Sequence, residues 1–286
     1  MKISASNNIL IVGLGLIGGS YARALTDNGY SVIAIDTNEN TIQYALDNKI
    51  ISKGFTKTED AINDIKCCDL TIFGLYPNDM LNWLSNYSCY LKDNSVITDV
   101  SGVKSPIVLK ANELLLNNVE FVASHPMAGK EVSGVMHSDA SIFKEANFII
   151  TPTSNNSEHA INVIQELATI LKFKNISILS TQKHDEMIGF LSQLTHVIAV
   201  TLMNTNDNTH LVEYTGDSFR DLTRIAKINE NLWSELFLLN KDVLLKEIDD
   251  FKNELDYFQE VLKKEDIDEL RRLFIQSTNR RKLFDK

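Results

Sequence analysis

Residues 8–20 have the sequence NILIVGLGLIGGS, and this stretch decides the fold. The apolar run at residues 9–12 predicts a buried parallel strand, which leads directly into a Gly-x-Gly-x-x-Gly pattern and then into a predicted helix over residues 20–28. In such a turn the first glycine lets the chain reverse, the second lets the backbone approach a pyrophosphate, and the third lets helix and strand pack closely. The free N–H groups at the start of the helix attract phosphate.

An acid at the end of the next apolar run favours one nucleotide. Residues 30–35 predict a second strand, and Asp36 follows it directly. A carboxylate there accepts hydrogen bonds from a ribose 2′-OH and repels a 2′-phosphate, which favours NAD over NADP. The alternative is a tight strand–helix turn followed by a solvated aspartate. We predict that the cofactor-binding residues here are Gly13, Leu14, Gly15, Leu16, Ile17, Gly18, Asp36 and Thr37.

The composition of the 286-residue chain is typical of a globular protein, with 44% apolar and 23% charged residues. The net charge of −10 argues against nucleic-acid binding. Three cysteines, Cys67, Cys68 and Cys89, have no metal-ligand spacing, so we expect no metal site and reduced thiols in a cytoplasmic protein. The first residues do not resemble a signal peptide and no window approaches 18 uninterrupted apolar residues, so we expect no membrane span.

Strand and helix patterns alternate from Asp36 to about residue 179. Strands are predicted at residues 70–75, 95–100, 121–124, 148–151 and 176–179, with helices at 38–49, 58–65, 78–90, 105–116 and 158–171. This rhythm predicts an α/β Rossmann-type doubly wound parallel sheet, with ligands over the carboxyl ends of the strands. We expect the segments that follow the strands to line one crevice, including the turn at residues 99–104 and the loop at residues 125–131. In this crevice Leu75, Tyr76 and Pro77 are predicted to contact the cofactor.

Long helical patterns replace this alternation from Thr181 onward, over residues 181–204, 232–263 and 265–284. The boundary predicted near Ser180 separates an NAD-binding Rossmann domain, residues 1–180, from an all-α domain, residues 181–286. Amphipathic helices of this length bury one face against a large surface. We therefore expect a homodimer formed through the C-terminal helices.

Polar residues in the predicted crevice are candidates for catalysis. A neutral His125 imidazole is suited to take the proton of a substrate hydroxyl while hydride leaves the same carbon, although a structural histidine is the alternative. Lys130 offers a positive charge to an anionic substrate, or is a solvated loop lysine. The hydroxyl and N–H groups at residues 99–104 contact nicotinamide or substrate, or form only a capped turn.

The predicted helical half contributes further candidates. Gln193 and His196 share one face of the helix at residues 181–204, where they contact substrate or make an interior hydrogen bond. Arg224 lies in the densest positive patch, residues 219–227, and a guanidinium binds a carboxylate through two hydrogen bonds. A solvated helix face is the alternative for this patch.

Five stretches in this order resemble the prephenate/arogenate dehydrogenases of tyrosine biosynthesis. The matching residues are 11–20, 98–104, 125–134, 192–196 and 221–227, followed by Trp233. The resemblance implies a nucleotide-binding domain, a helical dimerisation domain and the NAD-dependent oxidative decarboxylation of prephenate to 4-hydroxyphenylpyruvate. Hydride leaves C4 and CO2 leaves C1, so the ring becomes aromatic, and the enzyme mainly orients the reactants.

The resemblance also implies roles for single residues. His125 matches the catalytic histidine, which accepts a hydrogen bond from the C4 hydroxyl, and His196 and Arg224 match positions that bind substrate carboxylates. Glu131 matches an acid that gates or tunes the site, and Trp233 a residue near the substrate; Lys130 and Gln193 complete the predicted substrate site.

Two positions depart from the family pattern. Gly102 stands where many relatives have a hydroxyl-binding serine, so we expect Ser101 or the backbone to act as the catalytic substitute and Gly102 to contact the cofactor. Gln193 replaces a histidine found in some relatives. We further expect neither an ACT domain nor a fused chorismate mutase, so that any inhibition by tyrosine acts at the active site.

Other functions remain open at this point. The nearest is arogenate dehydrogenase, which yields tyrosine directly. A β-hydroxyacid dehydrogenase suits residues 192–196 and 221–227 less well. A non-catalytic NAD-binding sensor that dimerises through its helices belongs to a different class, and it leaves His125, His196 and Arg224 without a purpose.

Overall fold

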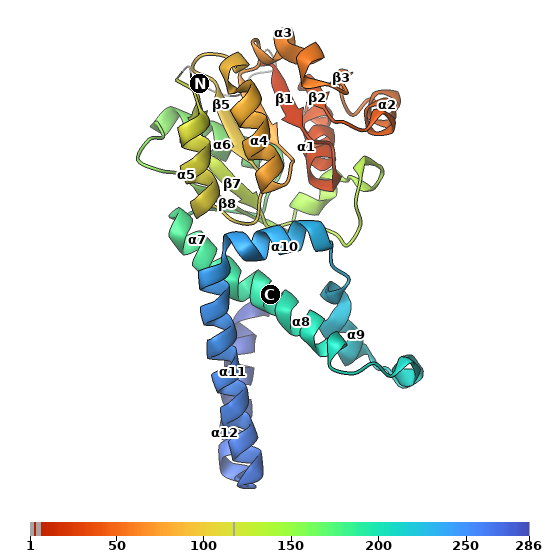
Figure 1. Cartoon of the computed structure of the whole chain (residues 1–286), viewed down its shortest axis with the longest axis vertical. Coiled ribbons are helices and arrows are strands. Elements are labelled where there is room, and N and C mark those ends of the chain that lie inside the picture. The colour runs from red at the N-terminus through yellow and green to blue at the C-terminus, as the bar shows by residue number, and fades with distance from the viewer. Residues whose placement is uncertain (1–2, 4–6, 117, 286) are drawn as a thin grey trace. The chain divides into compact units, whose positions relative to one another are not determined.

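The computed structural model describes residues 3, 7–116 and 118–285. By packing, the chain divides into two compact units, Met1–Asn240 and Lys241–Lys286. The first unit contains two β-sheets and the helices up to α10, and the second contains α11 and α12 (Figure 1). Helix α7 (Thr181–Ile188) packs against α5 (Ser105–Leu114), so packing continues across the boundary expected near Ser180, which stays a prediction.

The larger sheet has six parallel strands in the order β3-β2-β1-β4-β5-β6. This order confirms the Rossmann-type doubly wound sheet, and it reverses direction between β1 and β4, where ligands bind in such sheets. Strand β3 was not predicted, because it is short, contains a glycine and lies at the sheet edge. The strands are β1 (Ile9–Val12), β2 (Val32–Ile35), β3 (Lys53–Phe55), β4 (Leu70–Phe73), β5 (Val96–Asp99) and β6 (Glu120–Phe121).

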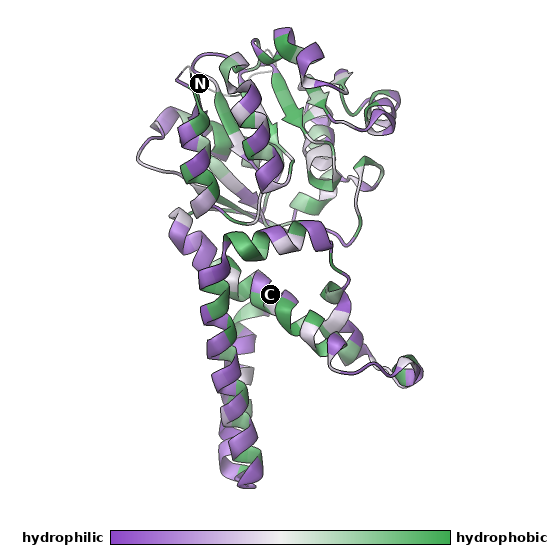
Figure 2. Cartoon of the chain, in the orientation of Figure 1, coloured by the Kyte–Doolittle hydropathy of each residue, from purple (hydrophilic) through white to green (hydrophobic). Residues whose placement is uncertain are grey.

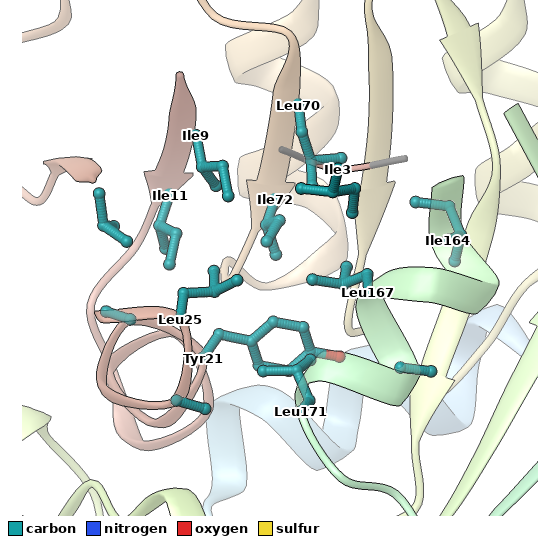
Figure 3. Close-up of a cluster of buried hydrophobic side chains, with 14 of the residues drawn as sticks. Ile3, Ile9, Ile11, Tyr21, Leu25, Leu70, Ile72, Ile164, Leu167 and Leu171 are labelled. Carbon is teal, nitrogen blue, oxygen red and sulfur yellow. The ribbon is translucent and has the colours of Figure 1, made fainter. Parts of the chain in front are cut away.

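Helices cover both faces of this sheet because its strands are apolar on both sides. Ile9 and Ile11 of β1 pack in a cluster with α1 (Leu16–Asp27) and α6 (Glu158–Ile170), which Figure 3 shows around Tyr21 and Leu167. The intervening residues of β1, Leu10 and Val12, point into a second cluster. That cluster contains residues of α3 (Ile62–Ile65), α4 (Pro77–Tyr87) and α5, whereas α2 (Glu39–Asp47) belongs to the first.

A second sheet of three strands follows and corrects one expectation. It consists of β7 (Ala123–Pro126), β8 (Asn147–Thr151) and β9 (Asn175–Ile178), with β7 antiparallel to β8. The N–H of Val122 still donates to the carbonyl of Ile97 in β5 (3.0 Å), whereas the N–H of Ser124 donates to the side chain of Asp99 (3.2 Å), where the chain has joined the second sheet. His125 therefore lies within a strand, opposite Ile149, and not in a loop after one.

The helical part of the first unit begins with a continuous segment, Thr181–Asn204. It comprises α7, a π-helical turn (Gly189–Leu194) and α8 (Thr195–Asn204), and is followed by α9 (Asp217–Thr223) and α10 (Glu230–Leu239). In the described part of the chain this segment alone is long and apolar enough to cross a membrane, by length and composition only. That is weak support for a span, since helices of protein cores pass the same test, and only 28% of its most apolar window is buried.

The second unit is a helical hairpin of α11 (Lys241–Lys263) and α12 (Ile267–Arg281). The rings of Phe258 and Phe274 face each other across it, and the Tyr257 hydroxyl donates to Glu269. The helix predicted over residues 232–263 is thus two helices, which break at Asn240. Hydrophobic and hydrophilic residues alternate in colour along the hairpin ribbon (Figure 2). Its exposed apolar side chains include Leu245, Phe251, Leu255, Leu262, Phe274 and Ile275.

Candidate active site

The glycine turn is packed so tightly that two of its glycines have no room for a side chain. Gly13 has a φ of +93°, and a Cβ atom there would lie 2.8 Å from the carbonyl oxygen of Gly74. A Cβ atom on Gly18 would lie 2.0 Å from the carbonyl oxygen of Gly13. Gly15, by contrast, has no atom within 4 Å of its Cβ position, so the backbone there is open to a phosphate group.

The start of α1 and the end of β2 complete a dinucleotide-binding edge. Gly15 caps α1 without a side-chain hydrogen bond and the first turn contains no acid, so N–H groups are free for a pyrophosphate. Asp36 accepts hydrogen bonds from the N–H of Leu14 (2.8 Å) and of Asn38 (2.9 Å), which ties it to the turn. Exposed Thr37 and residues 75–77, after β4, lie at this same carboxyl edge. These residues fit NAD.

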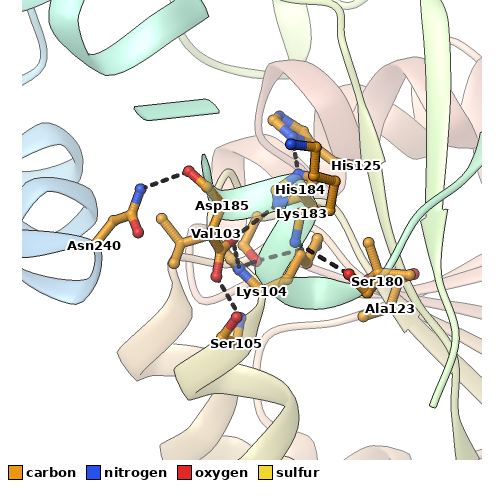
Figure 4. Close-up of polar contacts among 12 residues, drawn as sticks. Val103, Lys104, Ser105, Ala123, His125, Ser180, Lys183, His184, Asp185 and Asn240 are labelled. Carbon is orange, nitrogen blue, oxygen red and sulfur yellow. Dashed lines mark hydrogen bonds and ion pairs between the residues drawn. The ribbon is translucent and has the colours of Figure 1, made fainter. Parts of the chain in front are cut away.

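A chain of three side chains runs from the second sheet into α7 (Figure 4). Nδ1 of His125 lies 2.9 Å from Nε2 of His184, and Nδ1 of His184 lies 2.8 Å from Oδ1 of Asp185. The carboxylate of Asp185 also accepts the backbone N–H groups of Lys104 (2.8 Å) and Ser105 (2.7 Å), at the start of α5. Four hydrogen bonds among β7, α7 and the start of α5 therefore fix the orientation of the His125 ring.

The direction of these hydrogen bonds follows from the carboxylate, which can only accept. His184 therefore donates from Nδ1 to Asp185, and in its neutral form it accepts at Nε2. His125 then donates from Nδ1 to His184, which leaves the lone pair of its own Nε2 free. The His125 side chain is thus prepared to accept a proton or a hydrogen bond at Nε2.

Burial keeps both histidines neutral. It is the main reason why the pKa of His125 lies well below its usual value, and His184 and the charge of Lys104 lower it further. Burial also lowers the pKa of His184, against the opposing effect of Asp185. Burial alone would raise the pKa of Asp185, but hydrogen bonds from His184, Ser105 and Lys104 outweigh it and lower that pKa.

A fully buried lysine, Lys104, joins the two sheets close to the side chains of His125, His184 and Asp185. Nζ of Lys104 lies 2.7 Å from Oδ2 of Asp99, 2.6 Å from the carbonyl oxygen of Ser124 and 3.3 Å from Oγ of Ser101. Breaking a buried ion pair by removing one partner costs about 3–5 kcal/mol, so this contact holds β7 firmly beside β5. It places His125, the residue after Ser124, at a fixed position over the sheet edge.

The adjacent residues Ser101 and Gly102 have different surroundings. The Ser101 hydroxyl is buried and bonds with Asp99, the carbonyl of Val103 and Lys104, so its contacts give no support to the predicted catalytic substitution, which stays a prediction. Gly102 faces the imidazole instead. A Cβ atom there would lie 3.9 Å from Cε1 of His125 and 3.5 Å from Cδ1 of Leu236, so the chain has room for a side chain at this position.

Gln193 uses its amide inside the protein. Its Nε2 donates to the carbonyl of Leu236 (3.1 Å) and its Oε1 accepts from Asn240 (2.8 Å), which also donates to the carbonyl of Asp185 (3.0 Å). Gln193 is buried, and these contacts match the interior hydrogen bond that was the alternative to substrate binding. Its predicted role at the substrate is not tested by them.

The structure brings His196 and Trp233 together. Their ring centroids lie 3.6 Å apart with 30° between the planes, and Nδ1 of His196 donates to the carbonyl of Ser192 (2.8 Å). Trp233 and Leu236 are three residues apart and so share a face of α10. Because Leu236 lies near Gly102 and hence near His125, this face of α10 connects the regions of His196 and His125.

Each basic candidate already has an acidic partner. Arg224, in the 3₁₀ turn η7 (Arg224–Ala226) beside α8, forms an ion pair with Glu131. Lys130 lies 3.4 Å from Asp139, whose backbone N–H donates to Ser20 of α1 (3.0 Å). The loop with Lys130 and Glu131 is therefore anchored on the cofactor helix and reaches the helical part of the same unit.

Four residues of this site were missed or given no role from the sequence. Lys104 was included only as part of a turn, and His184, Asp185 and Asn240 were not selected. The available signal was weak, because His184 and Asp185 lie within the polar run at residues 181–186 and are distinguished from their neighbours only by their burial.

Comparison with known proteins gives consistent matches over both halves of the chain. A family model described as prephenate dehydrogenase, nucleotide-binding domain, matches residues 21–176. A second, described as prephenate dehydrogenase, dimerization domain, matches residues 180–276.

Individual relatives agree with these models. A prephenate dehydrogenase of Lactococcus lactis is 32% identical over 260 residues, which cover 87% of this chain and 69% of the relative. A cyclohexadienyl dehydrogenase of Zymomonas mobilis is 29% identical over 282 residues, which cover 96% of this chain and 94% of the relative. The crystal structure of prephenate dehydrogenase from A. aeolicus, in complex with hydroxyphenyl propionate and NAD+, is 28% identical with a TM-score of 0.91, and the match covers 99% and 100% of the two chains.

Proposed function

This chain belongs to the prephenate dehydrogenase family, and we propose that it catalyses the NAD-dependent oxidative decarboxylation of prephenate in tyrosine biosynthesis. One observation supports this reaction above the others. The hydrogen-bonded chain from Asp185 through His184 leaves the lone pair of His125 Nε2 free, near the edge that carries the dinucleotide loop. A neutral base beside a hydride acceptor is the arrangement that oxidation of an alcohol carbon requires.

In this mechanism His125 takes up a proton and later returns it. Its Nε2 accepts the proton of the C4 hydroxyl as hydride leaves C4, and the carboxylate on C1 departs as CO2 while its bonding electrons enter the ring. The proton then returns to the ring oxygen, so the products are 4-hydroxyphenylpyruvate, CO2 and NADH, with no net proton released. The bound NAD+ supplies the hydride acceptor.

The Asp185–His184 pair supports this step by orientation and by charge. Asp185 stabilises the positive charge that develops on the imidazoles when His125 takes the proton, because the carboxylate lies one hydrogen bond beyond His184. Lys104 acts in the opposite direction, since its ammonium group disfavours a lasting imidazolium. The lowered pKa of His125 therefore favours return of the proton to the product oxygen.

Substrate anions are bound by the predicted set Arg224, His196 and Lys130 in this proposal. Glu131 then acts as a gate, because a substrate carboxylate must replace it at Arg224. Trp233 offers a flat apolar surface, stacked on His196, for the substrate ring.

We also infer a cytoplasmic homodimer. The match of residues 180–276 to a dimerization domain supports the dimer, as do the exposed apolar side chains of the hairpin α11–α12. The three free cysteines, Cys67, Cys68 and Cys89, support a reducing location.

Formation of NADH tests the proposal directly. Purified protein with NAD+ and prephenate should raise the absorbance of NADH with equimolar release of CO2, and it should do so less well with NADP+. The same assay with arogenate tests the nearest alternative, arogenate dehydrogenase. The similarity to a relative named cyclohexadienyl dehydrogenase is the reason to include this substrate. Turnover of neither substrate would leave the NAD-binding sensor as the better interpretation.

A further inference from the structure

We propose that His196 takes up one proton when a carboxylate of the substrate binds, so that substrate binding by this chain is linked to proton uptake. The inference rests on the proposed function, because it concerns the same substrate. It adds a property that a carboxylate-binding histidine does not have by itself, since a histidine whose free nitrogen already carries hydrogen binds an anion without a proton.

The hydrogen bond to Ser192 determines which nitrogen of His196 carries hydrogen. A backbone carbonyl can only accept, so Nδ1 of His196, 2.8 Å away, must be the donor. The neutral ring has a single N–H, which leaves a bare lone pair on Nε2. In this state Nε2 repels a carboxylate oxygen, and it becomes a donor only when the ring is protonated.

The surroundings of His196 keep the ring neutral before substrate binds. Burial lowers its pKa, and the Ser192 carbonyl opposes this effect. The charged side chains on the elements packed against α8 are Asp217, Arg220 and Asp221 on α9, Arg224 on η7, and Glu230 and Glu235 on α10. Arg220 and Arg224 are paired with Asp217 and Glu131, so the burial of the ring remains the main influence.

The charges of the predicted anion site explain why the ring becomes protonated. Prephenate brings two carboxylates. The two permanent cations expected to receive them, Arg224 and Lys130, are each neutralised by an acid, Glu131 and Asp139. A carboxylate beside Nε2 of His196 therefore meets no surplus positive charge, and an opposite charge within hydrogen-bond distance strongly favours the charged imidazole. The stacked Trp233 ring also stabilises a cation over its face.

Proton uptake has a measurable consequence for affinity. Between the pKa of His196 in the substrate-free protein and its higher pKa in the complex, each rise of one pH unit should weaken substrate binding about tenfold, because one proton enters with each substrate molecule. Arg224 and Lys130 keep their charge over this range and produce no such slope.

Titration calorimetry with prephenate and NADH-loaded protein tests the inference, since NADH cannot accept hydride and the complex does not turn over. At pH 8 the binding enthalpy is measured in phosphate and in Tris, which have different ionisation enthalpies. The dependence of binding enthalpy on buffer ionisation enthalpy gives the number of protons taken up. We expect about one proton per prephenate, and a Kd that rises about tenfold between pH 7.5 and pH 8.5.

The variant His196→Gln assigns the proton. Its amide offers N–H groups without titrating, so uptake should vanish and Kd should become independent of pH. His137→Gln, at an exposed histidine, should keep the uptake of the unaltered protein. Buffer-independent enthalpy in the unaltered protein, or uptake that persists in His196→Gln, would overturn the inference. Absence of NADH formation from NAD+ and prephenate would instead overturn the proposed function.

Discussion

Nδ1 of His125 lies 2.9 Å from Nε2 of His184, and this contact joins the strand β7 to the helix α7. The two residues come from the two sides of the boundary predicted from the sequence. The proposed base is thus held by one element and oriented by another, and its free nitrogen has a defined direction. Substitutions at the two positions should therefore have different consequences.

Replacement of His125 by asparagine removes the base. General base catalysis contributes about 10²–10⁴-fold, so His125→Asn should lower kcat by two to four orders of magnitude. NAD+ binding should be nearly unchanged, because the glycine turn and Asp36 are untouched. Steady-state kinetics and an NAD+ titration check both statements, with His137→Asn as a control. A kcat within threefold of the unaltered enzyme would exclude His125 as the base.

Replacement of His184 tests orientation separately. In His184→Gln the amide oxygen can still accept from Nδ1 of His125, whereas His184→Leu removes every acceptor. We expect kcat to fall on the order of tenfold to a hundredfold in the leucine variant and clearly less in the glutamine variant, since the base itself remains. The measurement is kcat with KM for prephenate, which should change little. Equal kcat values in the two variants would contradict an orienting role.

The nucleotide half could be predicted from the sequence because its determinants are local. The glycine pattern, the apolar runs and Asp36 each act within a few residues, and the structure has the strands where the runs predict them. The edge strand β3 escaped prediction because Lys53–Phe55 has no apolar periodicity. The helix α1 begins at Leu16, earlier than expected, because the glycine turn itself forms its first turn.

The hydrogen-bonded series of Asp185, His184 and His125 could not be predicted, because it depends on contacts between residues that are distant in the sequence. His125 and His184 are 59 residues apart, and nothing near either one identifies the other. Where the chain enters the second sheet, Asp99 accepts from Ser124, a side-chain contact with no sequence pattern. Asn240 breaks the helix predicted over residues 232–263 while it bonds with Asp185 and Gln193, which again are distant in sequence.

Asp36 should determine the choice of nucleotide. Asp36→Ala removes the acceptor for the ribose 2′-OH and the contact with Leu14. A hydrogen bond to a charged group contributes about 1.5–3 kcal/mol, so KM for NAD+ should rise about tenfold or more. KM for NADP+ should fall, because the repulsion of the 2′-phosphate is lost. Asp27→Ala, on the exposed end of α1, is the matched control, and an unchanged ratio of the two KM values would disprove the assignment.

Arg224 and Glu131 should act on substrate affinity in opposite directions. Arg224→Gln should raise KM for prephenate by tenfold or more and leave kcat within a fewfold, because a carboxylate loses a charged partner worth about 1.5–3 kcal/mol. Glu131→Gln frees Arg224 from its ion pair and should lower KM. Arg220→Gln serves as the control, because Arg220 lies in the same patch and is likewise paired with an acid, Asp217, but is not part of the predicted substrate site. An unchanged KM in Arg224→Gln would place the substrate carboxylate elsewhere.

We expect kcat to decrease at acid pH. Burial holds the pKa of His125 well below 6.5, so the active neutral form already predominates at pH 7. At saturating prephenate and NAD+, kcat should be constant from pH 7 to pH 9 and should decrease only as the pH falls below 6.5 toward the lowered pKa. A kcat that rises toward acid pH would contradict a neutral base.

Acid should also destabilise the fold through His125 and His184. This loss of stability must be separated from the effect of pH on kcat. In the unfolded chain their pKa returns to about 6.5, so the unfolded state binds more protons below that pH and stability is lost as the pH falls toward the lowered pKa values. Melting temperatures at each pH therefore define the range in which kcat is interpreted. Within that range the residual activity of His125→Asn should lack the acid fall, because the group that titrates is gone.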